Sequence, residues 1–271
     1  MIAMRCMIAD AGSVDLGLAM SALSEERARL ASSFLFERDC RLSAVAGLFM
    51  GWISLTYDVE IRADPNGKPH ASGDKVHFNL SHSGRYVACA ISDVPVGIDI
   101  EAEGENLDLL AAVNMPEERD AFSCVPEGER EALFCRMWTA KESYMKAVGL
   151  GMSIPPESFR VVCETGITDR WLPRPYRIRE MAAPVGYRAS VCVAGDPGDP
   201  ILEEVDADVM ATLILGDRNR RGEANGCRKL SDSCSCAMAR ANGTNSISSP
   251  GGPTWISPRG EGRRPGPPGG S

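Results

Sequence analysis

The spacing of apolar residues divides residues 1–216 into two stretches that each pass from helix-like to strand-like patterns. In the first stretch, apolar side chains recur at helical spacing across residues 41–55, and Leu23–Arg27 resembles a helix start. Residues 21–57 are therefore predicted to be mostly helical. The apolar run at residues 1–9 is shorter than a processed signal and has no basic segment ahead of it, so it predicts a first strand.

Two strand-like runs close the first stretch. Residues 86–91 and 96–100 are rich in β-branched and small apolar side chains, and they follow a turn at Asp64–Pro69. Only the four residues Ser92–Pro95 separate the two runs. We therefore expect them to pair as an antiparallel hairpin.

The second stretch repeats this order of elements. Residues 116–122 and 129–148 have helical spacing, and strand-like segments follow at residues 159–163, 176–179 and 187–193. Helices followed by a small antiparallel set, occurring twice, predict an α+β fold. We expect two similar halves, residues 1–101 and 102–216, related by pseudo-twofold symmetry and each with helices on a small antiparallel sheet.

Residues 217–271 differ from the rest in composition. Of these 55 residues 24 are Gly, Pro or Ser, and the apolar periodicity ends. Such a segment buries too little apolar surface to offset the entropy lost on ordering, so it is predicted to be a disordered tail. Its cysteines, Cys227, Cys234 and Cys236, lack the four regularly spaced ligands of a structural zinc site.

Charge also separates the two parts. Residues 1–216 contain 20 Lys and Arg against 33 Asp and Glu, whereas residues 217–271 contain 9 against 4. An acidic body argues against general nucleic-acid binding, and no apolar run approaches the roughly 20 residues of a membrane span. An anionic ligand would need a local cluster of positive groups. Single cysteines scattered through apolar segments indicate buried thiols and a cytoplasmic location.

The strand-like run Val96–Glu101 carries two carboxylates at alternate positions. Side chains alternate along a strand, so Asp99 and Glu101 point away from Ile98 and Ile100. Magnesium prefers oxygen ligands of this kind, often one or two carboxylates together with substrate phosphates. A half-exposed strand with a polar outer face would give the same alternation, so the run by itself leaves both interpretations open.

A second candidate group lies on the long predicted helix. Trp138, Glu142 and Lys146 are four residues apart and therefore share one helix face. A surface ion pair would explain Glu142 and Lys146, but a Trp on the same stripe indicates partial burial, where both charges need partners. Glu142 would then complete a metal site, and Lys146 would face a phosphate or a leaving group.

Two smaller polar groups precede the carboxylates. Residues Phe78–Gly84 place the hydroxyls of Ser81 and Ser83 on either side of His82, an arrangement suited to phosphate. A serine hydrolase is the competing interpretation, but the Gly-x-Ser-x-Gly motif is missing. Lys68, in a predicted turn, is either a further phosphate-binding group or a solvated loop lysine.

In this order, the segments Gly-Lys-Pro, Phe-Asn-Leu-Ser-His-Ser-Gly, Gly-Ile-Asp-Ile-Glu and Trp-x-x-Lys-Glu-Ser-x-x-Lys resemble the signature of 4′-phosphopantetheinyl transferases, in particular the monomeric Sfp-type branch. The resemblance covers residues 21–194 and leaves the tail uncovered. It implies two related α+β halves with coenzyme A in the cleft between them. The implied reaction moves the phosphopantetheine arm of coenzyme A to a serine of an apo acyl or peptidyl carrier protein, releasing adenosine 3′,5′-bisphosphate.

The resemblance also implies a role for each candidate residue. Asp99, Glu101 and Glu142 would hold magnesium, and Lys146 would contact the pyrophosphate and assist the leaving group. Either Glu142 or a water on the metal would be the base for the carrier serine. The residues that would hold the phosphates of coenzyme A are Lys68, Ser81, His82 and Arg41, of which Arg41 lies in the least specific part of the match.

The partners are expected from the same resemblance. Carrier proteins are generally acidic, as this body is, so docking should depend on hydrophobic contacts or a local basic patch to which Arg174, Arg177 and Arg179 could contribute. The protein is expected to act as a monomer. Two alternatives remain at this point: another magnesium-dependent enzyme of nucleotide or phosphate chemistry, and a non-catalytic relative that binds coenzyme A.

Overall fold

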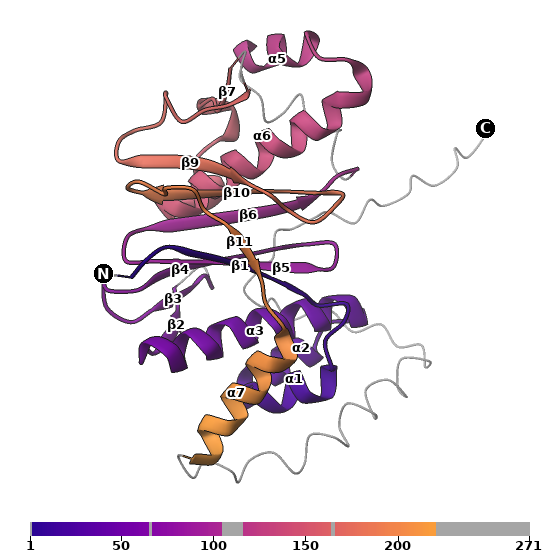
Figure 1. Ribbon diagram of the computed structural model, residues 1–271, viewed down its shortest axis with the longest axis vertical. Coiled ribbons are helices and arrows are strands. Elements are labelled where there is room, and N and C mark those ends of the chain that lie inside the picture. The colour runs from indigo at the N-terminus through magenta and orange to yellow at the C-terminus, as the bar shows by residue number, and fades with distance from the viewer. Residues whose placement is uncertain (1, 65–66, 105–115, 164–165, 221–271) are drawn as a thin grey trace, which may run out of the picture.

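The computed structural model describes residues 2–64, 67–104, 116–163 and 166–220 and has the predicted α+β fold (Figure 1). The elements before the second gap are β1 (Arg5–Asp10), α1 (Leu16–Ala22), α2 (Glu25–Ser32), α3 (Glu37–Tyr57), β2 (Ile61–Ala63), β3 (Pro69–Ala71), β4 (His77–Ser83), β5 (Tyr86–Ser92) and β6 (Val96–Ala102). Those after it are α5 (Pro116–Ser123), α6 (Glu127–Val148), the 3₁₀ turns η2 (Gly151–Ser153) and η3 (Pro156–Ser158), β7 (Val162–Cys163), β8 (Gly166–Ile167), β9 (Tyr176–Met181), β10 (Tyr187–Ala194), β11 (Leu202–Glu204) and α7 (Ala207–Arg220).

The main elements form four layers. One sheet has the strand order β11-β1-β5-β4, and the other has the order β6-β10-β9. In Figure 1, α1, α2, α3 and α7 lie below the first sheet, while α5 and α6 lie above the second. The buried apolar residues form three clusters that match these layers: one under the first sheet, one between the two sheets, and one between the second sheet and α6.

Capping residues mark the ends of several helices. Ser24, at the N-cap of α2, accepts a hydrogen bond from the backbone N–H of Arg27, and Asp15 does the same for Leu18 in α1. Helix α6 ends at Gly149, whose φ of 84° is readily adopted only without a side chain. Within the described parts of the chain, no helix is both long and apolar enough to cross a bilayer.

The predicted hairpin of residues 86–91 and 96–100 is wrong. Strand β5 pairs with β1 and β4, whereas β6 pairs with β10 in the other sheet. The short link at residues 93–95 carries the chain from one sheet to the next, and Ala88 and Ala90 of β5 pack face to face against Ile98 and Ile100 of β6. Chain proximity predicted contact between the two strands correctly but could not distinguish edge pairing from face packing.

The end of the described chain returns to the first half. Strand β11 pairs in parallel with β1, and Met210, Ala211 and Ile214 of α7 pack in the same core cluster as α3. The predicted division of the chain places these residues in the second half. Helix α7 also continues to Arg220, four residues into the predicted tail. The remainder of that tail, with Cys227, Cys234 and Cys236, lies outside the described residues.

Candidate active site

The carboxylates and the lysine predicted from the sequence come together between β6 and α6. The Nζ atom of Lys146 lies 2.6 Å from Oδ1 of Asp99 and 3.2 Å from Oε2 of Glu142. The same ammonium donates to the Ser81 hydroxyl of β4 at 3.1 Å. Three segments distant in sequence therefore converge on one charged group.

Gly97 allows this convergence. A Cβ atom at this position would lie 2.2 Å from the backbone oxygen of Ser143 and 2.4 Å from the backbone nitrogen of Ala147. Real Cβ atoms do not approach so closely, so β6 and α6 can contact here only because the residue has no side chain. The glycine thus sets the separation between the carboxylate strand and the helix that carries Glu142 and Lys146.

Burial decides between the two interpretations of the carboxylate strand. Asp99 is 1% exposed and Glu101 is 7% exposed, so they do not belong to a solvated outer face. The stripe on α6 is buried too, with Trp138 at 8% and Glu142 at 9% exposure. Asp99 and Glu142 both pair with Lys146, as buried charges require.

The pKa values of Asp99 and Lys146 are both raised, and the carboxylates close to them contribute to each shift. Burial, together with the neighbouring carboxylates Glu142 and Glu101, raises the pKa of Asp99 to about 8 even though the Lys146 ammonium opposes the shift. Burial alone would lower the pKa of Lys146, but Asp99 and Glu142 outweigh it and raise that pKa. The site therefore favours bound positive charge.

One oxygen of the cluster suits a further cation. Oδ2 of Asp99 is buried and has no hydrogen-bond partner. A buried acceptor without a donor is costly, and a hard cation would satisfy it. Across the described residues, however, no three His, Cys, Asp or Glu side chains are already arranged as a metal site. The donor atoms fit magnesium in kind, and the Lys146 ammonium lies where two of the carboxylates meet.

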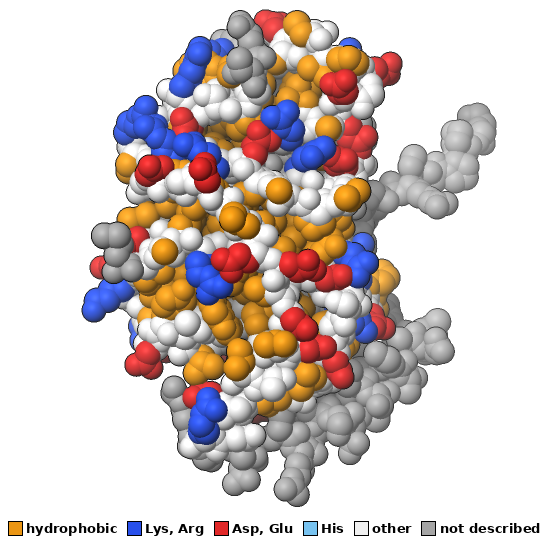
Figure 2. All heavy atoms as spheres, in the orientation of Figure 1, with side chains coloured by type: hydrophobic (Ala, Val, Ile, Leu, Met, Phe, Trp, Pro, Cys, Tyr) orange, Lys and Arg blue, Asp and Glu red, His pale blue; other side chains and the backbone are white. Residues whose placement is uncertain are grey.

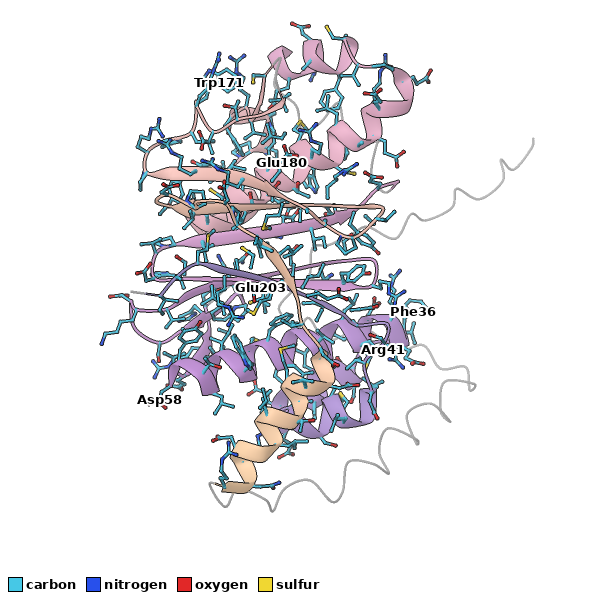
Figure 3. All side chains as sticks on the ribbon, viewed as in Figure 1. Phe36, Arg41, Asp58, Trp171, Glu180 and Glu203 are labelled. Atoms are coloured by element: carbon cyan, nitrogen blue, oxygen red, sulfur yellow. The ribbon has the colours of Figure 1, made fainter. Side chains whose placement is uncertain are left out.

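The other predicted phosphate ligands differ in how closely they join this cluster. Lys68 donates through Nζ to the backbone oxygen of Lys146 at 2.8 Å, and burial followed by the Lys146 charge lowers its pKa. His82 pairs in register with Val87, so it lies on the face of β4 opposite to Ser81. Arg41 lies at the start of α3 (Figure 3), where it donates to the backbone oxygen of Val14 and pairs with Glu37.

Two structural contributions were not recognised from the sequence. Ser83 donates to Oε2 of Glu101 at 2.9 Å, in the way that Ser81 donates to Asp99. Lys141, in the same motif as Glu142, is fully buried and donates to Glu118 of α5 at 2.6 Å and to two backbone oxygens. The alternation of polar residues at 79, 81 and 83 was a signal for the first, whereas nothing local to Lys141 indicated its distant partner.

A surface cavity of about 340 Å³ lies beside the earlier turns of α6. Its lining includes Leu133 and Arg136 of α6 and Arg188 of β10. Arg188 is the β10 residue paired with Glu101, so the cavity adjoins the end of the carboxylate strand. Its walls combine apolar side chains with two arginines and the carboxylate of Glu129.

Comparison with known proteins identifies this arrangement. Residues 95–191, which include β6, α6 and the first part of β10, match the family model described as the 4′-phosphopantetheinyl transferase superfamily. The chain is 37% identical over 140 residues to the 4′-phosphopantetheinyl transferase gsp of Aneurinibacillus migulanus, covering 50% of this chain and 58% of that protein. It is 34% identical over 134 residues to a 4′-phosphopantetheinyl transferase of Bacillus subtilis, covering 47% and 60%.

A longer match extends through both halves. The chain is 30% identical over 187 residues to the 4′-phosphopantetheinyl transferase Sfp of Bacillus subtilis (strain 168), covering 65% of this chain and 84% of that protein. The matches to the first two relatives span less than two thirds of their lengths, but the match to Sfp spans more. By sequence similarity over this length, and with Asp99, Glu142 and Lys146 gathered at one site, the chain belongs to the 4′-phosphopantetheinyl transferase superfamily.

Proposed function

We propose that this protein transfers the 4′-phosphopantetheine arm of coenzyme A to a serine of an apo acyl or peptidyl carrier protein, releasing adenosine 3′,5′-bisphosphate, with magnesium as its cofactor. The main support for the proposal is that Asp99, Glu142 and Lys146 converge in a buried cluster of charged side chains. The family model matches the segment that holds these residues, and the relatives compared above are 4′-phosphopantetheinyl transferases.

In this proposal, Asp99, Glu101 and Glu142 hold magnesium. When bound, the ion would neutralise charge on the pyrophosphate of coenzyme A, which is the usual contribution of magnesium to phosphoryl chemistry. The Oδ2 atom of Asp99 has no hydrogen-bond partner, and the pKa of this carboxyl group is raised. Both observations support a site that binds a cation. Lys146 lies beside the same carboxylates and would meet the bridging oxygen that becomes negative as the bond breaks.

The carrier serine must lose its hydroxyl proton as its oxygen attacks phosphorus. Glu142 is suited to accept that proton because it lies at the edge of the cluster, with 9% exposure, on a helix fixed by close contact at Gly97. The adjacent Lys146 ammonium would stabilise the leaving bisphosphate, so the two roles fall on one helix face. Catalysis in this scheme comes from positioning and charge stabilisation.

Local positive groups would hold the phosphates of coenzyme A in an otherwise acidic body. Lys68 and Ser81 lie next to Lys146, and they would bind the pyrophosphate side. His82 lies on the other face of β4, toward the core cluster that contains α3, and Arg41 lies on α3 itself. We assign these two residues to the 3′-phosphate end, which extends away from the carboxylates.

Carrier docking would use the basic segment of residues 160–179. Trp171 lies between two guanidinium groups, with Arg160 3.4 Å and Arg170 4.0 Å from its ring centre. Arg177 and Arg179 share the single carboxylate of Asp169, so positive charge is in excess there. Blue side chains gather at this corner of the surface (Figure 2), where Figure 3 labels Trp171. An acidic carrier complements this patch, and not the acidic body.

The direct test is transfer of mass to a carrier. Purified full-length protein is incubated with magnesium, coenzyme A and apo acyl or peptidyl carrier domains, and each carrier is weighed by mass spectrometry. We expect a gain equal to phosphopantetheine that EDTA prevents. If carriers of both classes keep their apo mass while coenzyme A binds normally, the protein is a non-catalytic relative and the proposal is wrong.

The free cysteines of the described chain agree with a reducing cytoplasm, where these substrates occur.

A further inference from the structure

The two sheets meet at a seam between β4 and β6 that has no backbone ladder. In the described strands, β4 pairs with β5 and β6 pairs with β10, and no register joins β4 to β6. Edge strands carry unpaired backbone N–H and C=O groups, and burying them without partners is costly. Something other than a main-chain ladder must satisfy the buried edge of β6.

Side chains of β4 satisfy it at three successive rungs. Oδ1 of Asn79 accepts from the N–H of Ile98 at 3.0 Å. Oγ of Ser81 accepts from Ile100 at 3.4 Å, and Oγ of Ser83 accepts from Ala102 at 3.0 Å. Acceptors and donors both recur at every second residue, which is the side-chain period of a strand. Asn79, Ser81 and Ser83, here called the seam residues, therefore form a ladder in register with β6.

Each serine of the seam also contacts the carboxylate that precedes its N–H donor. Ser81 donates to Oδ1 of Asp99 at 2.6 Å, and Ser83 donates to Oε2 of Glu101 at 2.9 Å. A hydroxyl has one hydrogen and two lone pairs, so one serine can fix both the backbone and the carboxylate of β6. Asn79 occupies the rung beside Gly97, where β6 has no side chain to hold.

We infer that the seam residues position the two carboxylates for the reaction, and that Ser83 is the positioning residue for Glu101. The inference rests on the proposed function, because it gives Glu101 a metal-binding role. A side chain between two strands separates them more than the roughly 4.8 Å of a backbone ladder, which leaves space along the seam for carboxylates. All three seam residues are at most 7% exposed, so water does not compete for their hydrogen bonds.

Ser83 allows the inference to be tested apart from direct ligand contacts. Ser83→Ala removes the hydroxyl donor to Glu101 and the acceptor for Ala102. Loss of a hydrogen-bond partner behind a metal ligand typically weakens metal binding by about 10-fold to 100-fold. Ser83→Thr keeps the hydroxyl and suits a strand, whereas Ser83→Cys keeps the size of the side chain with a weak donor. Comparing Thr with Cys therefore separates hydrogen bonding from volume.

The experiment measures Mn²⁺ affinity of the full-length protein by electron paramagnetic resonance, with Mn²⁺ as the probe for magnesium. We expect affinity to fall about 10-fold to 100-fold in Ser83→Ala and similarly in Ser83→Cys, and to stay near wild type in Ser83→Thr. The matched control is Ser54→Ala, which removes a hydroxyl that donates to the backbone oxygen of Val59 in the first half. That variant should bind Mn²⁺ as the wild type does.

The possible failures are distinguishable. If Ser83→Ala lowers the melting temperature but binds Mn²⁺ with wild-type affinity, Ser83 has only a structural role and the inference is overturned, while carrier modification by the wild type still supports the proposed function. If Ser83→Ala does not fold, weak binding by Ser83→Cys supports the inference and wild-type binding by Ser83→Cys overturns it. If the wild type binds no Mn²⁺ and modifies no carrier, the proposed function fails as well.

Discussion

Gly97→Ala tests how the close contact between β6 and α6 creates the site. The added Cβ would lie 2.2 Å from Ser143 O, 2.4 Å from Ala147 N and 2.9 Å from Lys146 C. Optimal contacts of carbon atoms lie near 3.5 Å, so relief needs a displacement of about 1 Å. All three obstructing atoms belong to the helix backbone, so α6 must move as a unit or β6 must shift away.

Such a shift is comparable to the lengths that define the cluster. The contact of Lys146 with Asp99, which joins α6 to β6, is 2.6 Å long, and an added 1 Å would take it beyond the length of a hydrogen bond. A misplacement of about 1 Å can cost about 100-fold in rate, and overpacking costs roughly 1–3 kcal/mol in stability. We expect both effects in Gly97→Ala.

The assay is the initial rate of carrier modification at saturating coenzyme A, with thermal unfolding measured in parallel. Gly128→Ala is the control on the same helix, because a Cβ there meets no atom within 4 Å. Gly51→Ala is a second control, in which the Cβ meets side-chain atoms of Ile214 and no backbone, the nearest being the terminal Cδ1 at 3.0 Å. Wild-type rate and stability in Gly97→Ala would show that the contact does not position the reacting groups. A loss of stability with a normal rate would assign the glycine to folding alone.

Further predictions concern single charges. Glu142→Gln should abolish carrier modification while leaving the melting temperature near wild type, and retention of full activity would contradict its assignment. In EDTA, Asp99→Asn should gain stability over the wild type as pH rises from 5 to 9, because a folded-state pKa raised to about 8 stabilises the protein at low pH and that contribution is lost as pH rises through 8. The slope is at most about 1.4 kcal/mol per pH unit, and a melting-temperature difference independent of pH would refute the cause given. Glu118→Ala removes the carboxylate partner of the fully buried Lys141 ammonium and should cost about 3–5 kcal/mol in chemical denaturation; less than 1 kcal/mol would show that the ion pair is dispensable. Arg174→Glu should raise KM for the carrier without changing KM for coenzyme A, whereas Arg62→Glu, in the exposed β2 strand, should change neither; equal effects of the two would exclude docking at residues 160–179.

Much of the candidate site was predictable because its residues follow local periodicities. Alternation along a strand put Asp99 and Glu101 on one face, and helical spacing put Trp138, Glu142 and Lys146 on another. The presence of Trp138 on that stripe indicated burial, and both groups are buried. These inferences needed only the geometry of a single strand or helix.

Other features depend on segments far apart in the chain, and local patterns could not provide them. The sequence determined that residues 86–91 and 96–100 are strands, but only the tertiary structure decided that β5 and β6 pack face to face in different sheets. It determined a polar alternation through Ser81 and Ser83, but the partners of those hydroxyls lie 18 residues along the chain, across an unpaired edge. Side-chain period is a property of each strand alone, whereas pairing, burial of charge and the approach permitted by Gly97 depend on which surfaces meet.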